Sequence, residues 1–156
     1  MIEVHKRVFV GTDLECRPGD TAWAVVHACK IPCHQHAVGY VGSLPKTHPN
    51  YLVLDKPNDL YLNMIDPSQP LFMLPLFTSF MHFASQRWDE GRALLIHCNQ
   101  GESRAPSLAM LLLAKHIGVI SASSFDAARH EFDAIFPAYA PGLGIQSYLR
   151  QHWGEI

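Results

Sequence analysis

The chain has 156 residues, of which 48% are hydrophobic and 17% are charged, and its formal net charge at pH 7 is -2. This length and apolar content predict a single domain over residues 1–156, and the nearly neutral charge excludes the broad field that attracts nucleic acid or a membrane surface. Because no segment has the pattern of a signal peptide or reaches transmembrane length, we expect a cytoplasmic protein whose oligomeric state the sequence leaves open.

The first half of the chain carries four short apolar runs that predict β-strands. Arg7–Gly11 (RVFVG) ends in a glycine turn, and Trp23–His27 (WAVVH) has a β-branched centre. Tyr51–Leu54 and Leu60–Ile65 are two further runs, separated by the turn-forming sequence DKPND. The stretch 39–50, rich in Gly, Ser and Pro, predicts a surface loop before them.

The chain contains four cysteines: Cys16, Cys29, Cys33 and Cys98. A chain of this size with so many hydrophobic residues can form a core without cross-links, so the four cysteines do not indicate a disulfide framework. Thiols and imidazoles are zinc ligands, so a metal hypothesis arises for one cluster within eight residues, which comprises Cys29, Cys33, His34 and His36. Zinc sites usually bring a second ligand pair from a distance, and here the other candidates are scattered. We therefore favour ordinary loop packing and predict no metal and no other cofactor.

An aspartate in a proline-bounded loop follows the fourth predicted strand. Asp66 opens the sequence DPSQP, just past the strand end. Because α/β proteins bind ligands at the carboxyl edge of their sheets, this carboxylate is well placed to reach one. The alternative is an ordinary Asx-Pro turn. Asp55 and Asp59 are weaker candidates because they flank the turn between two strands.

Helical patterns dominate the second half of the chain. Aromatic residues recur at helical spacing between Pro75 and Gly91, which predicts core packing. A helix that is apolar nearly all round runs from about residue 105 to 117, and Gly118 ends it. A third helix begins at a serine N-cap within 121–124 and stops at Pro137, and a fourth covers about 144–153.

Residues 93–115 organise the rest of the chain, because strand, polar loop and helix follow one another directly there. The continuously apolar Leu94–Ile96 predicts a central strand that is covered on both faces. Proline is tolerated in the first helical turn, so Pro106 requires the helix to begin close to Arg104. The loop Asn99–Ser103 therefore lies at a helix N-terminus, whose unpaired N–H groups and positive dipole end form an anion site.

Three residues of this segment indicate the chemistry. Gly101 lets the backbone bend so that successive amides point inward. Cys98 ends the strand and faces these amides, which favour its thiolate form. Arg104 stands at the helix start, where a planar guanidinium can grip two oxygens of one anion. A thiolate nucleophile and a phosphate cradle in one loop are what displacement at phosphorus through a cysteinyl-phosphate needs.

The sequence HCNQGESR, from His97 to Arg104, resembles the His-Cys-x5-Arg signature of the cysteine-dependent protein tyrosine phosphatase superfamily. The short chain around it most resembles the dual-specificity phosphatase branch, and the resemblance extends over residues 7–153. It implies an α/β fold in which helices flank a central, mostly parallel sheet of four or five strands, the phosphotyrosine protein phosphatase-like fold. The segment APGLGIQSYL (140–149) is similar to the family's late helix, whose start packs near the active loop.

The resemblance implies a protein tyrosine or dual-specificity phosphatase that acts on a phosphorylated protein or a small phosphomonoester. Cys98 would be the nucleophile, and Asp66, 32 residues before it, resembles the family's general acid in its placement. His97 is expected to support the loop by hydrogen bonds from behind, although a strand-end histidine without such a role fits the sequence equally well. The expected phosphate-binding loop comprises Asn99, Gln100, Gly101, Glu102, Ser103 and Arg104.

Ala105 departs from the family pattern, which usually has a hydroxyl residue after the signature arginine. That hydroxyl normally donates to the sulfur and eases its departure in the second step. Unless Ser103 or Ser107 takes its place, we expect the phosphoenzyme to break down slowly after a burst of product. Glu102 would repel additional phosphates, so the sequence favours phosphotyrosine in a protein over a phosphoinositide.

Two other classes of function fit parts of the pattern. A catalytically impaired relative that binds phosphoprotein would be consistent with Ala105. A rhodanese-like sulfurtransferase also holds a cysteine between a strand and a helix. The six-position spacing from Cys98 to Arg104 and the acid at Asp66 favour phosphate chemistry over sulfur transfer.

Overall fold

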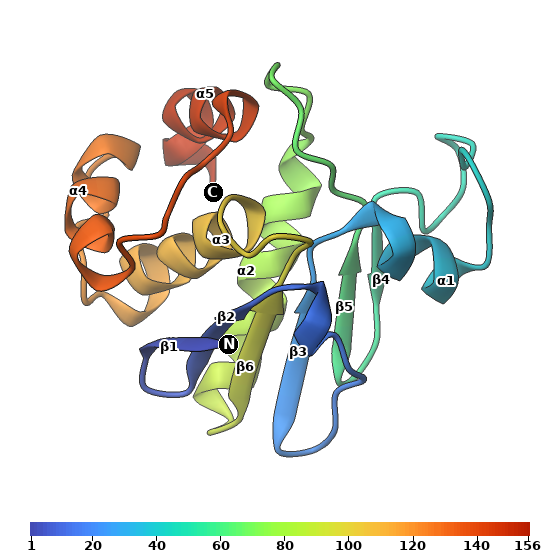
Figure 1. Ribbon diagram of the computed structural model, residues 1–156, viewed down its shortest axis with the longest axis horizontal. Helices are drawn as coiled ribbons and strands as arrows, with labels where there is room; N and C mark the ends of the chain where they lie inside the picture. The colour runs from blue at the N-terminus through green and yellow to red at the C-terminus, as the bar shows by residue number, and fades with distance from the viewer.

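A six-stranded sheet forms the centre of the computed structural model, which describes residues 1–156. The strand order across the sheet is β1-β2-β6-β3-β5-β4 (Figure 1). The strands are β1 (Ile2–His5), β2 (Val8–Gly11), β3 (Trp23–His27), β4 (Val53–Asp55), β5 (Asp59–Leu62) and β6 (Ala93–His97).

The four inner strands, β2, β6, β3 and β5, are parallel to one another. The edge strands β1 and β4 pair antiparallel with β2 and β5. The predicted α/β class with a mostly parallel sheet is therefore confirmed. The sheet has six strands rather than the expected four or five because β1 adds an unexpected edge. Its residues Ile2 and Glu3 are exposed, so they give no clear apolar alternation, and a tight turn with Arg7 at φ 65° returns the chain into β2.

The predicted helices are present: α2 (Leu74–Asp89), α3 (Arg104–Leu112), α4 (Phe125–Ile135) and α5 (Leu143–His152). Helical turns continue α3 through Leu113–Ile117, and the Ser124 hydroxyl caps α4 by accepting a hydrogen bond from the Ala127 N–H. An unexpected helical segment, Lys30–His34 followed by α1 (Gln35–Val38), comes after β3. In Figure 1, α3, α4 and α5 gather on one side of the molecule and α1 lies on the other. None of the helices combines the length and apolar character that crossing a membrane requires.

The alternation of side chains along the strands gives the sheet two different faces. Leu94 and Ile96 of β6 belong to the main hydrophobic core, which α2 and α3 cover. Phe77 and Phe80 of α2 are fully buried there, and each such burial stabilises the fold by about 2 kcal/mol. His97, one residue further along β6, belongs to the opposite face and is completely buried.

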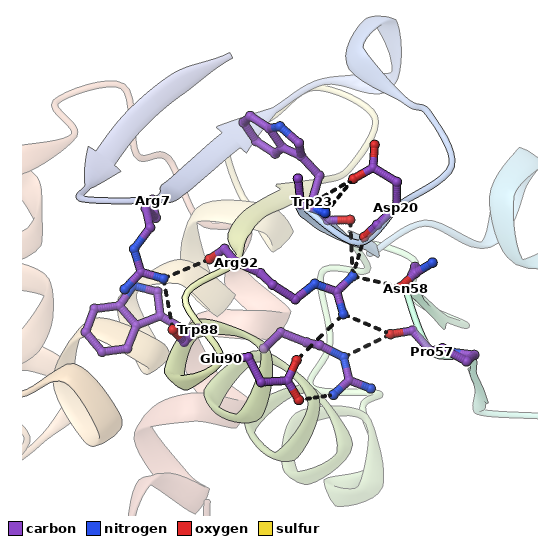
Figure 2. Close-up of polar contacts among 10 residues, drawn as sticks. Arg7, Asp20, Trp23, Pro57, Asn58, Trp88, Glu90 and Arg92 are labelled. Carbon is purple, nitrogen blue, oxygen red and sulfur yellow. Dashed lines mark hydrogen bonds and ion pairs between the residues drawn. The ribbon is translucent and has the colours of Figure 1, made fainter.

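Arginine side chains fasten the amino ends of the central strands (Figure 2). The Arg92 guanidinium, just before β6, donates to the carbonyls of Asp20 and Pro57 and to the side-chain oxygen of Asn58. Arg7 donates to the carbonyls of Trp88 and Arg92, at 2.9 Å each. These bonds fix the loops at one end of β6, and Cys98 with the turn that follows it lies at the other end.

Candidate active site

Cys98 follows the last residue of β6 and is 2% exposed. Two backbone amides approach its sulfur: the Gly101 N–H donates to Sγ at 3.3 Å and the Ala105 N–H at 3.5 Å. Gly101 belongs to the predicted turn and Ala105 to the first turn of α3, and N–H donors stabilise negative charge on the atom that accepts from them. The loop and the first turn of α3 thus each place one N–H donor near the sulfur.

Gly101 is the residue that makes this turn possible. Its φ is 73°, in the left-handed region that favours glycine. A Cβ atom at this position would also lie 3.0 Å from the Gly11 carbonyl oxygen. The backbone conformation and the close approach of β2 therefore both exclude a larger residue, in agreement with the sequence-based interpretation.

Arg104 is the first residue of α3 and is 9% exposed. Its Nη1 donates to the carbonyls of Met64, at 2.9 Å, and Ala28, at 3.2 Å, and its Nη2 donates to the Asn99 side chain at 2.8 Å. The Nε atom is buried without a hydrogen-bond partner. The guanidinium is thus fixed in position while its Nε donor remains available for a further acceptor.

The predicted residues Cys98, Arg104 and Asp66 line one pocket of about 320 Å³. Asp66 is exposed and comes from the loop after β5, so the structure joins it to a loop 32 residues away in the sequence. The rest of the wall consists of Asn99, Gln100, Glu102, Ser103, Ala140 and Gly142. Arg104 is the only cationic side chain in this wall, beside the carboxylates of Asp66 and Glu102.

The segment before α5 closes the pocket, as the similarity of residues 140–149 to the family's late helix had suggested. The Gly142 N–H donates to the Ser103 hydroxyl at 2.9 Å, and the Ala140 N–H donates to the Glu102 carbonyl at 2.8 Å. A Cβ on Gly142 would lie 2.5 Å from a carboxylate oxygen of Asp66. The glycine therefore lets the loop that carries Asp66 approach the phosphate-binding loop.

Neither nearby serine takes the place of the missing hydroxyl at Ala105. The Ser107 hydroxyl donates to the Ser103 carbonyl at 2.7 Å and lies 2.8 Å from the Tyr139 hydroxyl. The Ser103 hydroxyl accepts from Gly142 instead. Ser107 thus supports the loop through its backbone, and the hydrogen bonds to the Cys98 sulfur come from backbone amides.

His97 is part of a buried polar chain that sequence reasoning did not find. His97 Nε2 lies 2.8 Å from His27 Nδ1, and His27 Nε2 lies 2.9 Å from the Asp59 carboxylate. Burial lowers the pKa of His97 to about 4 and also lowers the pKa of His27. The Asp59 carboxylate therefore bonds His27 and does not line the pocket that contains Cys98. Both β3 and β6 end in histidine, but only the register of the folded sheet pairs these two residues.

The sequence cluster weighed as a possible metal site, Cys29, Cys33, His34 and His36, does not assemble in the structure. The His34 ring bonds the Tyr40 hydroxyl at 2.7 Å and the Asn50 carbonyl at 2.9 Å, so both of its nitrogens are engaged. Cys33 instead lies with Cys16, His27 and His97, which come from other segments of the chain. Short sequence spacing grouped the wrong residues, because the fold turns His34 away from Cys33.

Neither a model of a known protein family nor a curated protein sequence matches the chain. Solved structures do match over nearly its whole length. A human tyrosine phosphatase-like serine/threonine/tyrosine-interacting protein aligns with a TM-score of 0.65 and 13% identity, covering 98% of this chain and 95% of that one. The chain has the dual-specificity phosphatase fold. Human DUSP28, at 18% identity and a TM-score of 0.61 over 98% of this chain and 91% of its own, shares this phosphatase fold.

Proposed function

We propose that residues 1–156 form one catalytic domain of a phosphomonoester hydrolase, a protein tyrosine or dual-specificity phosphatase. The observation that carries this proposal is the common pocket of Cys98, Arg104 and Asp66, at a turn whose amides donate to the Cys98 sulfur. A nucleophile, an anion clamp and a proton donor in one pocket are the groups that phosphoryl transfer to sulfur needs. The phosphatase fold supports the same activity.

In the first step, the Cys98 thiolate attacks phosphorus, the bond from phosphorus to the ester oxygen breaks, and Asp66 protonates the leaving oxygen. The loop amides and the Arg104 guanidinium stabilise the phosphoryl oxygens as charge redistributes. In the second step, Asp66 takes a proton from water, the water oxygen attacks phosphorus, and the sulfur leaves as thiolate with release of inorganic phosphate. This chain's own residues and water account for every bond and proton, so we propose no cofactor for the reaction.

We propose a phosphorylated protein side chain, phosphotyrosine first, as the substrate. The pocket has one cation, Arg104, which matches a single phosphate group. Glu102 and Asp66 add negative charge to the wall, and this charge disfavours substrates that carry several phosphates. All four cysteines are free thiols, and a catalytic thiolate needs a reducing compartment, so we place the protein in the cytoplasm.

A second candidate is a module that binds phosphoprotein without turnover. Ala105 favours this candidate, because no hydroxyl contacts the Cys98 sulfur to ease its departure. A human protein with the same fold is named phosphatase-like and interacting, which is compatible with a binding role for this fold. This candidate predicts tight binding of a phosphopeptide with no release of phosphate.

Hydrolysis of a generic aryl phosphate separates these functions. The enzyme proposal predicts phosphate release by the wild type and its loss in Cys98→Ser, with phosphotyrosyl peptide hydrolysed in the same way. Phosphopeptide binding without turnover would support the module instead. Thiosulfate sulfurtransferase activity without phosphatase activity would reverse the ranking in favour of a rhodanese-like function.

A further inference from the structure

Behind the phosphate-binding loop, four metal-ligating side chains converge from four separate segments. Cys16 comes from the loop after β2, His27 from the end of β3, Cys33 from the helical segment that follows, and His97 from the end of β6. One ligand atom from each residue lies within 4.8 Å of the other three. We propose that Cys16, His27, Cys33 and His97 form a zinc site that holds the base of the phosphate-binding loop.

Two of the spacings between the ligand atoms match tetrahedral zinc, and the two imidazole nitrogens, 2.8 Å apart, would have to separate to the roughly 3.3 Å that two nitrogens on one ion take. With Zn–S bonds of about 2.3 Å, two thiolates on one tetrahedral ion are about 3.8 Å apart, and a thiolate and an imidazole nitrogen are about 3.6 Å apart. Cys16 Sγ lies 3.8 Å from Cys33 Sγ and 3.6 Å from His27 Nδ1. Two soft sulfurs and two imidazoles form a donor set that selects zinc over the hard cations Mg²⁺ and Ca²⁺.

The outer partners of the two histidines suit metal binding. Asp59 accepts a hydrogen bond from His27 Nε2, which leaves the lone pair of Nδ1 directed at the cluster. His97 Nε2 faces the same position. His97 Nδ1 lies 3.5 Å from the Cys98 carbonyl oxygen, which can accept a hydrogen bond from Nδ1 when that nitrogen carries the proton. Without metal, one N–H joins the two rings across 2.8 Å. Zinc would replace that hydrogen bond, and the His97 proton would move to Nδ1.

The cluster is accessible to an ion from solvent. Cys16 is exposed, and a surface pocket of about 380 Å³ reaches Cys16, His27 and Cys33. Binding by two thiolates releases their two protons, and zinc undergoes no change of oxidation state. Since His97 directly precedes Cys98, a bound ion would tie β3, β6 and the loops after β2 and β3 together beside the catalytic turn.

Cys29 provides a matched control within the same region. It is a buried free thiol four residues before Cys33. Its sulfur is nevertheless not one of the four converging ligand atoms. A cysteine in the same environment but outside the cluster therefore separates coordination from the general effect of losing a thiol.

The test uses the full chain with Cys98→Ser, which removes the thiol of the candidate active site as a competing zinc ligand. Zinc binding is measured against a chromophoric chelator, and Co²⁺ replaces Zn²⁺ for absorption spectra. We expect one ion per chain and a cobalt spectrum with thiolate charge-transfer bands and tetrahedral d–d bands. Adding Cys16→Ser, at an exposed position that is compatible with folding, should weaken zinc binding by about a hundredfold, and Asp59→Asn by about tenfold.

The control Cys29→Ser should leave zinc affinity within about twofold of the parent. An octahedral cobalt spectrum without charge-transfer bands, or no stoichiometric zinc under reducing conditions, would overturn the site. Equal weakening by Cys29→Ser and Cys16→Ser would do the same. A Cys16–Cys33 disulfide that persists in reductant, with no bound metal, would show instead that these thiols form a covalent link.

Discussion

Arginines near the two ends of β6 have similar hydrogen-bond partners, yet only one of them forms part of a candidate active site. At the amino end, Arg92 donates to backbone carbonyls and to the Asn58 side chain (Figure 2). At the carboxyl end, Arg104 donates to backbone carbonyls and to the Asn99 side chain. In both arginines the Nε atom is buried without a partner.

The difference lies in what surrounds each guanidinium. Arg104 shares its pocket with Cys98 and Asp66 and stands at the N-terminus of α3. Arg92 joins loops that carry neither a nucleophile nor a helix start. An unpartnered buried donor therefore does not identify a site by itself, whereas a donor, a nucleophile and an acid in one pocket do.

The largest effect should come from removing the nucleophile at the carboxyl end of β6. Cys98→Ser replaces the sulfur with a hydroxyl that the same amides cannot ionise, so kcat for an aryl phosphate should fall by at least about a thousandfold. Circular dichroism should show an unchanged fold. Retained activity in this variant would remove Cys98 from the mechanism.

Matched substitutions of the two arginines test directly whether only Arg104 contributes to activity. Arg104→Lys keeps the charge but loses the planar fork, and we expect kcat/KM to fall by about a hundredfold or more. Arg92→Lys should leave kcat/KM within about twofold and lower the free energy of unfolding by about 1–2 kcal/mol, because it removes bonds to two loops. Steady-state kinetics and urea denaturation measure both quantities. Equal losses of activity in the two variants would show that the pocket does not distinguish Arg104 from Arg92.

The effect of removing the Asp66 carboxylate on kcat should depend on how readily the leaving group departs without a proton. Asp66→Asn cannot protonate the departing oxygen, so kcat should fall by about a hundredfold for a phosphotyrosyl peptide. The loss should be much smaller for an aryl phosphate whose leaving group is already a stable anion. A comparison of the two substrates measures this, and an equal loss with both would assign Asp66 a role other than proton transfer.

The smallest change concerns Ala105, where the chain departs from the sequence pattern that it otherwise resembles. Ala105→Ser restores a hydroxyl next to the sulfur, so steady-state turnover should rise by about threefold to tenfold and the burst of product should shrink. Stopped-flow measurements with an aryl phosphate would resolve both phases. Ser107→Ala is the control, because its hydroxyl bonds the Ser103 carbonyl and should leave the burst unchanged. A linear time course in the wild type would contradict slow breakdown of the phosphoenzyme.

Local sequence was enough to predict the strand, turn and helix around Cys98. The constraints are strong there: Pro106 limits where α3 begins, and Gly101 adopts a φ that favours glycine. The fold and the pairing of Asp66 with Cys98 needed the family resemblance, because an aspartate before a proline is also a common turn residue.

The features behind the sheet could not be predicted in the same way. The contact between His27 and His97 depends on the register of β3 against β6, and strand order cannot be read from either strand alone. The grouping of Cys16 with Cys33 depends on two irregular segments that have no periodic pattern. The edge strand β1 was missed because two of its four residues are exposed and it has no clear apolar alternation.

The most direct test of the central claim is mass spectrometry of the wild-type protein, quenched in acid during turnover of an aryl phosphate. Slow breakdown should leave one phosphoryl group on the peptide that carries Cys98, and Cys98→Ser should show none. Phosphate release without any labelled peptide, or a phosphoryl group on a different residue, would contradict a cysteinyl-phosphate at the end of β6.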